Sequence, residues 1–147
     1  MSTLTPAERA EAKVCAELLA TGPYWWGAGM VFSALTAATW VVTGPTALWE
    51  VPTLALSLAS TWAVSRVVID VGLFRAMAHE AGPFANLQAL DTALMGLLPV
   101  RLSHPAGSRS VSDRVRGAFR WWLGVVFMAL CQACGWLLMC WQIVRGS

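Results

Sequence analysis

The sequence predicts an all-α membrane protein with three transmembrane helices, arranged as an antiparallel hairpin plus one. An N-terminal amphipathic helix and a cytoplasmic interfacial helix complete the predicted fold. Three long apolar stretches carry the prediction, at residues 24–42, 51–69 and 121–144. A helix needs about 20 apolar residues to cross a hydrocarbon core of about 30 Å, and each stretch is of about that length. Charged residues make up 12% of the 147-residue chain, whereas soluble domains carry about 25%.

Residues 1–22 are expected to form the N-terminal amphipathic helix. Thr5, Pro6 and Glu8 show the pattern of a capping box with Pro at the first helical position. On a helix over residues 6–20, one face is apolar and consists of Ala7, Ala10, Val14 and Leu18. This helix is expected to lie on the cytoplasmic membrane surface or against the long connection that follows the hairpin.

Residues 23–74 are expected to form the transmembrane hairpin. Both of its crossings carry small residues at a spacing of four, which places them on one helix face. Small side chains let two helix backbones approach closely, and this drives helix association in lipid. The predicted packing residues are Gly29, Ser33 and Ala37 on the first crossing and Ala55, Ala59 and Ala63 on the second.

Tryptophans and Gly-Pro pairs mark the expected ends of the crossings. Trp25 and Trp26 stand at one end of the first crossing and Trp40 at the other, and an indole ring prefers the membrane interface. The Gly-Pro pairs are at 22–23, 44–45 and 82–83. Gly suits the end of a helix and Pro the first turn of the next one.

Residues 75–110 are expected to form a cytoplasmic connection, and residues 111–147 the C-terminal transmembrane helix. Residues 84–98 read as an interfacial helix, with a fourth crossing as the alternative, and residues 99–109 read as a loop. Ser110 and Asp113 resemble a second capping box. The last helix would be longer than a bilayer requires, so its first turns should stand in the cytoplasm.

The placement of arginine predicts the orientation of the chain. The connection over residues 43–51 holds no Lys or Arg, whereas six arginines lie between the second and third crossings: Arg75, Arg101, Arg109, Arg114, Arg116 and Arg120. Because basic residues favour the cytoplasmic side, the N-terminus and residues 75–110 are expected inside. Lys13 is the single lysine among ten basic residues. This bias fits GC-rich coding DNA, so a bacterial inner (cytoplasmic) membrane is expected.

Cys131 and Cys134 form the one motif with a named chemistry. A Cys-x-x-Cys pair can cycle between dithiol and disulfide. The pair falls near the middle of the third crossing, where forming a thiolate is costly because water is absent. Packing, in which cysteine acts as a small apolar residue, is therefore the favoured role, and redox chemistry remains the alternative.

Charged residues at the cytoplasmic end of the crossings are expected to anchor the chain to the interface or to lipid. They are Arg66, Asp70, Arg114, Arg116 and Arg120. Arginine side chains in such places extend to the headgroups. The same arginines could suggest nucleic acid, but positive-inside topology accounts for them, and no nucleic-acid partner is expected.

No catalytic, cofactor-binding or metal-binding residue is predicted, since His79 and His104 lack a second ligand at helical spacing. The expected function is that of a non-enzymatic accessory, scaffold or regulatory subunit of a larger membrane assembly. The expected partners are the lipid bilayer and either a protein or a second copy of the chain. Contacts would use the transmembrane helices and the cytoplasmic connection. A toxin-immunity or holin-like membrane protein is one alternative, and a membrane thiol oxidoreductase using Cys131 and Cys134 is the other.

Overall fold

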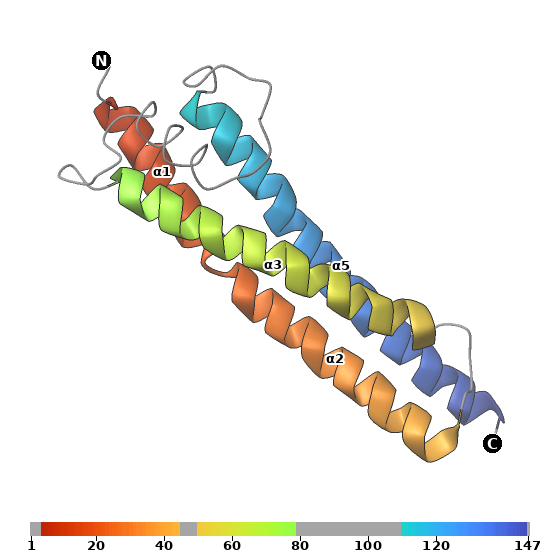
Figure 1. Ribbon diagram of the computed structural model, residues 1–147. Coiled ribbons are helices and arrows are strands. Elements are labelled where there is room, and N and C mark those ends of the chain that lie inside the picture. The colour runs from red at the N-terminus through yellow and green to blue at the C-terminus, as the bar shows by residue number, and fades with distance from the viewer. Residues whose placement is uncertain (1–3, 45–49, 79–109, 147) are drawn as a thin grey trace, which may run out of the picture. The chain divides into compact units, whose positions relative to one another are not determined.

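The computed structural model describes residues 4–44, 50–78 and 110–146, and all regular structure in this part of the chain is helical (Figure 1). The helices are α1 (Pro6–Leu19), α2 (Gly22–Thr43), α3 (Glu50–Ala78) and α5 (Val111–Gly146). Three helical segments are long and apolar enough to cross a membrane: Pro6–Val42, which joins α1 to α2, Val51–Ala78 and Val111–Arg145. The predicted all-helical fold with three potential crossings is therefore confirmed. The predicted interfacial helix over residues 84–98 and the loop over 99–109 lie outside the described residues.

The chain divides into two compact units. The charged unit combines Met1–Ala20 with Ile69–Phe119, and the spanning unit combines Thr21–Val68 with Arg120–Ser147. The helices α3 and α5 each contribute to both. The charged residues of the spanning unit are Glu50, Arg66, Arg120 and Arg145. Every other Asp, Glu, Lys and Arg among the described residues belongs to the charged unit, so most of the described charge lies in one of the two units.

The charged unit begins with the predicted capping box. The Thr5 hydroxyl accepts a hydrogen bond from the Glu8 backbone N–H over 3.2 Å, and the Thr5 N–H donates to Glu8 Oε2 over 2.8 Å. These two bonds satisfy donors that the first turn of a helix leaves open, which is why α1 starts at Pro6.

The buried face of α1 differs from its predicted apolar face. Its buried residues are Ala12, Cys15, Ala16 and Leu19. The predicted face is exposed throughout, at Ala7, Ala10, Val14 and Leu18. Three of the four buried residues are small, so α1 packs by close approach instead of by its larger apolar side chains.

In the spanning unit, α2, α3 and α5 lie side by side (Figure 1). Contacts between α2 and α3 run in opposite chain order, because Trp26 bonds Thr61 whereas the later Ser33 bonds the earlier Ser57. These two helices are therefore antiparallel. Contacts between α2 and α5 run in the same order, from Thr21 with Trp122 to Phe32 with Trp136, so α5 is parallel to α2.

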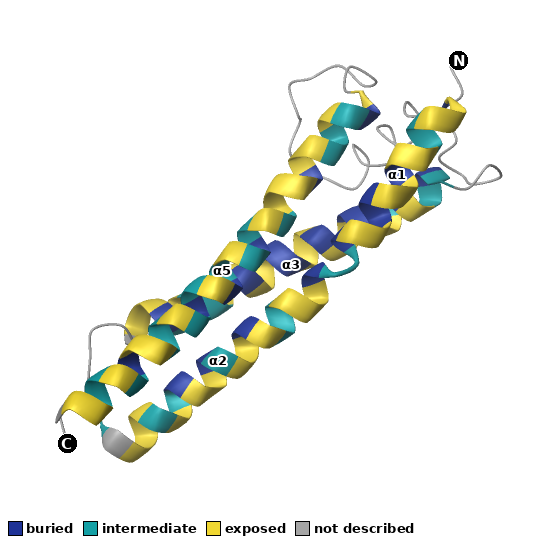
Figure 2. Ribbon diagram, turned by 180° about the vertical axis from the view of Figure 1, so that it is seen from behind, coloured by how far each residue is buried: buried dark blue, intermediate teal, exposed yellow. Residues whose placement is uncertain are grey.

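Polar residues are prominent in the interior of the spanning unit. Its buried polar residues are Ser33, Thr36, Thr53, Ser60 and Gln132. Many large apolar side chains of the same helices are exposed, among them Leu58, Phe127 and Leu137. Figure 2 shows buried positions recurring along α2 between exposed ones. An apolar exterior around a partly polar interior suits a lipid solvent, in which helices associate through close packing and hydrogen bonds.

Helix α2 ends at a position that requires glycine. Gly44 has a φ of 74°, and its N–H donates to the Trp40 carbonyl over 2.9 Å. A side chain at this φ would be strained, whereas glycine adopts it freely. The Gly-Pro pair at 44–45 thus marks a helix end, as the sequence predicts.

Candidate functional site

The strongest polar arrangement in the spanning unit joins all three of its helices. Gln132 of α5 donates from Nε2 to the Ser57 hydroxyl of α3 over 3.3 Å. The Ser57 hydroxyl donates in turn to the Ser33 hydroxyl of α2 over 2.6 Å. The exposed fraction is 0% for Gln132 and 4% for Ser33. We call these three residues the Gln132 cluster. In an apolar surrounding such bonds help to fix which helices associate and in what register.

Two glycines allow the helices to approach at this level. A Cβ atom on Gly29 of α2 would overlap the Gln132 side chain and would also lie 3.4 Å from the Ala129 Cα atom. A Cβ atom on Gly135 of α5 would lie 2.5 Å from the Thr53 hydroxyl of α3. A Cβ atom at either point would require the facing Gln132 or Thr53 side chain to move, so glycine permits the observed close contacts.

The six predicted packing residues differ in how far they are buried. On α2, Gly29 and Ser33 are buried and Ala37 is half-buried. On α3, Ala63 is buried, but Ala55 and Ala59 are exposed. Two α3 side chains that form hydrogen bonds with α2 are the hydroxyls of Ser57 and Thr61.

Sequence reasoning did not single out Gln132 or Gly135. Gln132 is an amide within a long apolar stretch, and a polar side chain inside a crossing is itself a signal of a special role. The Cys-x-x-Cys motif, which has Gln132 at its second position, drew attention to the flanking cysteines instead.

Tryptophans near the start of α2 and of the Arg120–Ser147 segment form further contacts among α2, α3 and α5. Trp26 donates from Nε1 to the Thr61 hydroxyl over 3.1 Å, and Trp122 donates to the Thr21 hydroxyl over 2.9 Å. The rings of Trp62 and Trp121 meet edge to face, with centroids 4.9 Å apart. At the other end of α5, Arg145 lies over the Trp141 ring at 4.1 Å. Indoles near both ends of the apolar part of α5 fit an aromatic belt at two membrane surfaces.

All four cysteines are free thiols. Cys131 and Cys140 are half-buried, Cys134 is exposed and Cys15 is buried in the charged unit. The two cysteines of the Cys-x-x-Cys motif thus differ in environment, because Cys131 is half-buried and Cys134 is exposed. Among the residues that the structure describes, no group of three His, Cys, Asp or Glu side chains could hold a metal ion.

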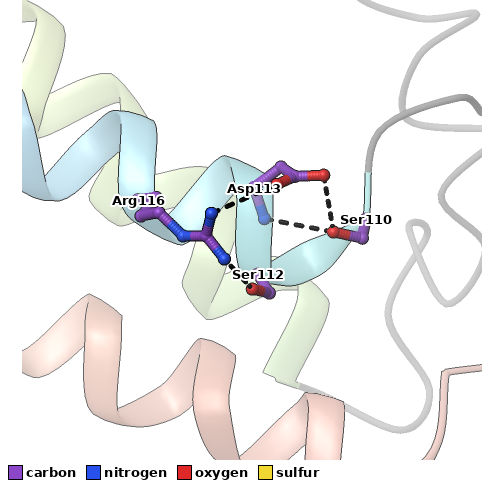
Figure 3. Close-up of polar contacts among 4 residues, drawn as sticks. All are labelled: Ser110, Ser112, Asp113 and Arg116. Carbon is purple, nitrogen blue, oxygen red and sulfur yellow. Dashed lines mark hydrogen bonds and ion pairs between the residues drawn. The ribbon is translucent and has the colours of Figure 1, made fainter.

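In the charged unit, polar contacts organise the start of α5 (Figure 3). The Ser110 hydroxyl accepts from the Asp113 N–H over 3.2 Å and donates to Asp113 Oδ2 over 2.8 Å. Arg116 lies 4.0 Å from the Asp113 carboxylate and donates to the Ser112 hydroxyl over 3.4 Å. The guanidinium of Arg116 nevertheless remains mostly exposed, so it is available for a further contact.

The other predicted anchoring residues occupy different environments. Arg66 and Arg120 are exposed, Arg114 is half-buried and Asp70 is buried with an exposed fraction of 8%. Arg75, on the same helix as Arg66, forms an ion pair of 3.7 Å with Glu17 of α1. Pairs as exposed as this one stabilise a fold by only about 0–1 kcal/mol. Arg101, Arg109 and both histidines lie outside the described residues.

Comparison with models of protein families, with curated proteins and with solved structures finds no match to this chain.

Proposed function

We propose that this chain is a multi-pass protein of a bacterial inner membrane that serves as a non-enzymatic accessory, scaffold or regulatory subunit of a larger assembly. The observation that carries the proposal is the division of the chain into a spanning unit and a separate compact charged unit. A protein that only filled the bilayer would not need a second unit with its own buried residues. The charged unit supplies a folded surface on which another protein can dock.

The charged unit has both the core and the surface that docking requires. Its buried apolar residues come from three helices and include Leu19 of α1, Phe74 and Met77 of α3 and Val111 of α5. Its exposed surface carries Lys13, Glu17 and Arg116. Such a mixture of charges favours recognition by electrostatic complementarity, which sets specificity and association rate.

The orientation follows from the arginines of the charged unit, with this unit and the N-terminus in the cytoplasm. In that orientation the exposed apolar face of α1 faces the membrane surface. Val14 is 71% exposed and Leu18 is 39% exposed, and an amphipathic helix buries such residues at the boundary between headgroups and acyl chains. Arg66 and Arg120 then extend to anionic headgroups.

Site-specific photocrosslinking in the native cell tests the docking role. A photoreactive residue is placed at Lys13 or Arg116 in the charged unit, and at Leu58 or Phe127 in the spanning unit as matched exposed controls. We expect one discrete protein adduct at Lys13 and Arg116, and lipid adducts at Leu58 and Phe127. Protein adducts confined to Leu58 and Phe127 would instead indicate helix-to-helix contacts within the bilayer, and the docking proposal would fail.

A charge reversal adds a functional readout. Arg116→Glu should abolish the adduct at Lys13 while leaving membrane insertion intact, because it removes an exposed cation from the docking surface. Arg145→Glu, at the opposite end of α5, is the matched control and should leave the adduct unchanged. Equal adduct yields in the two variants would contradict a role for the charged unit.

A further inference from the structure

Two arginines lie at the same end of the spanning unit. Arg66 stands two residues before the end of the Thr21–Val68 segment, and Arg120 is the first residue of the Arg120–Ser147 segment. Because α3 is antiparallel to α2 and α5 is parallel to it, these two positions come to the same end of the three helices. Both arginine side chains are exposed.

A contact between two tryptophans holds these positions close together. The rings of Trp62 of α3 and Trp121 of α5 meet edge to face, with centroids 4.9 Å apart, and both side chains are exposed. Arg66 follows Trp62 by one turn on the same face of α3. Arg120 directly precedes Trp121 in α5. The two indoles therefore bring two guanidinium groups to neighbouring positions on the outside of α3 and α5, which we call the Arg66–Arg120 surface.

The Arg66–Arg120 surface carries an excess of positive charge. Among the described residues of the spanning unit the one acid is Glu50, the first residue of α3. At 1.5 Å per residue, Glu50 is about 24 Å from Arg66 along the helix. Asp70 follows Arg66 by one turn but is buried, and a guanidinium has enough N–H donors to bond within the protein and to an outside anion together. Neighbouring like charges repel each other, so an anion that binds both arginines is stabilising.

The residues beside this surface favour a lipid as the source of that anion. Toward the middle of the same helices the exposed side chains are apolar, as at Leu58 of α3 and at Leu123 and Phe127 of α5. Acyl chains pack on such side chains, whereas a soluble anion gains nothing from them. An exposed indole at a membrane interface likewise places its ring among acyl chains and its N–H toward headgroup oxygens.

The number of arginines indicates the kind of headgroup. A guanidinium binds a phosphate through two parallel N–H···O bonds, so one phosphate matches one arginine. Basic surfaces between transmembrane helices are known to recognise headgroups with more than one phosphate. We propose that the Arg66–Arg120 surface binds a phospholipid with two phosphodiester groups, one at each guanidinium. This site rests on the membrane placement in the proposed function, but it is independent of the docking role of the charged unit.

Lipid titrations followed by native mass spectrometry test the site. The full chain in detergent is titrated with tetraoleoyl cardiolipin, which has two phosphodiester groups, or with twice that concentration of dioleoyl phosphatidylglycerol, which has one. The anionic charge supplied is then equal. We expect the apparent Kd for cardiolipin to be about tenfold lower, because a second charge-assisted hydrogen-bonded contact contributes at least about that factor. Equal affinity for the two lipids would overturn the site.

Single substitutions locate the two phosphates. Arg66→Gln alone and Arg120→Gln alone should each abolish the preference for cardiolipin, because the remaining guanidinium binds one phosphate. Arg145→Gln is the matched control, since Arg145 lies over the Trp141 ring at the other end of α5, and it should keep the full preference. Thermal unfolding in the same detergent checks that each variant is folded. A preference that survives either substitution at the proposed site would rule out binding by two arginines.

The possible failures of this site and of the proposed function are distinguishable. A chain that binds neither lipid would contradict the membrane placement together with the site. Loss of the protein adducts at Lys13 and Arg116, with the preference for cardiolipin intact, would contradict the docking role and support the lipid site. Equal binding of the two lipids, with those adducts intact, would overturn the lipid site alone.

Discussion

Gly29 of α2 lies against the Gln132 side chain of α5, so closely that a Cβ atom at position 29 would overlap the amide unless the amide moved. The same amide is bonded to Ser57 of α3. Gln132 is thus held between a backbone surface and a hydroxyl that belong to two different helices. Displacing the amide would therefore disturb its contacts with both neighbouring helices.

Replacing Gly29 should therefore destabilise the spanning unit. Gly29→Ala forces the Gln132 amide to move away from Ser57, and we expect a loss of about 1–3 kcal/mol in the free energy of unfolding. Unfolding of the purified protein in mixed micelles measures the loss. Gly27→Ala on the same helix is the control, because a Cβ atom there meets no atom within 4 Å. If the effect of Gly29→Ala persists in a Gln132→Ala background, the contact described above is not its cause.

Enlarging a predicted packing residue on α2 should destabilise the protein more than enlarging one on α3. Ser33→Leu places a branched side chain in a contact between helices, and we expect a loss of about 1–3 kcal/mol. Ala59→Leu should be nearly neutral, since Ala59 is exposed and would face lipid. Thermal unfolding in detergent compares the two variants. Destabilisation by Ala59→Leu would show that α3 packs through its alanines.

The two cysteines of the Cys-x-x-Cys motif should be packing residues. Cys131 and Cys134 are expected to remain reduced in the isolated protein, because in a segment apolar enough to cross a membrane cysteine acts as a small apolar packing residue. Mass spectrometry after alkylation of the unfolded chain counts the free thiols. The variant Cys131→Ala/Cys134→Ala should retain the cellular phenotype. A disulfide that responds to quinone or to a periplasmic oxidant would support thiol oxidoreductase activity instead.

The proposed orientation can be tested with single cysteines in a background that lacks the native ones. Thr46→Cys lies in the connection expected outside, and Ser108→Cys in the connection expected inside. A membrane-impermeant thiol reagent applied to intact cells should label position 46 only, because the arginine-rich connection stays in the cytoplasm. Labelling of position 108 without position 46 would reverse the topology.

The sequence by itself determined the features that depend on local composition. Three apolar stretches of bilayer length predict three helices that could cross a membrane, and the structure contains three such helices. The pattern at Thr5 and Glu8 predicts a capping box, and its two hydrogen bonds are present. Gly44 ends α2, as expected of a glycine that can adopt the positive φ of a helix end. Helix length, caps and helix ends are decided by residues within a few positions of one another, so they can be read along the chain.

Only the tertiary structure decided which faces of the helices meet. A soluble helix reveals its inner face by alternating apolar and polar residues, but a crossing is apolar on every side, and its sequence pattern gives little directional information. Small residues therefore predicted Gly29 and Ser33 as packing positions but equally indicated Ala55 and Ala59, which are exposed. On α1 the sequence predicted an apolar face that includes Val14 and Leu18, but these residues are exposed in the structure. Gln132 acquires its place only when α2 and α3 bring Gly29, Ser33 and Ser57 around it, because its hydrogen bonds join residues far apart in the chain.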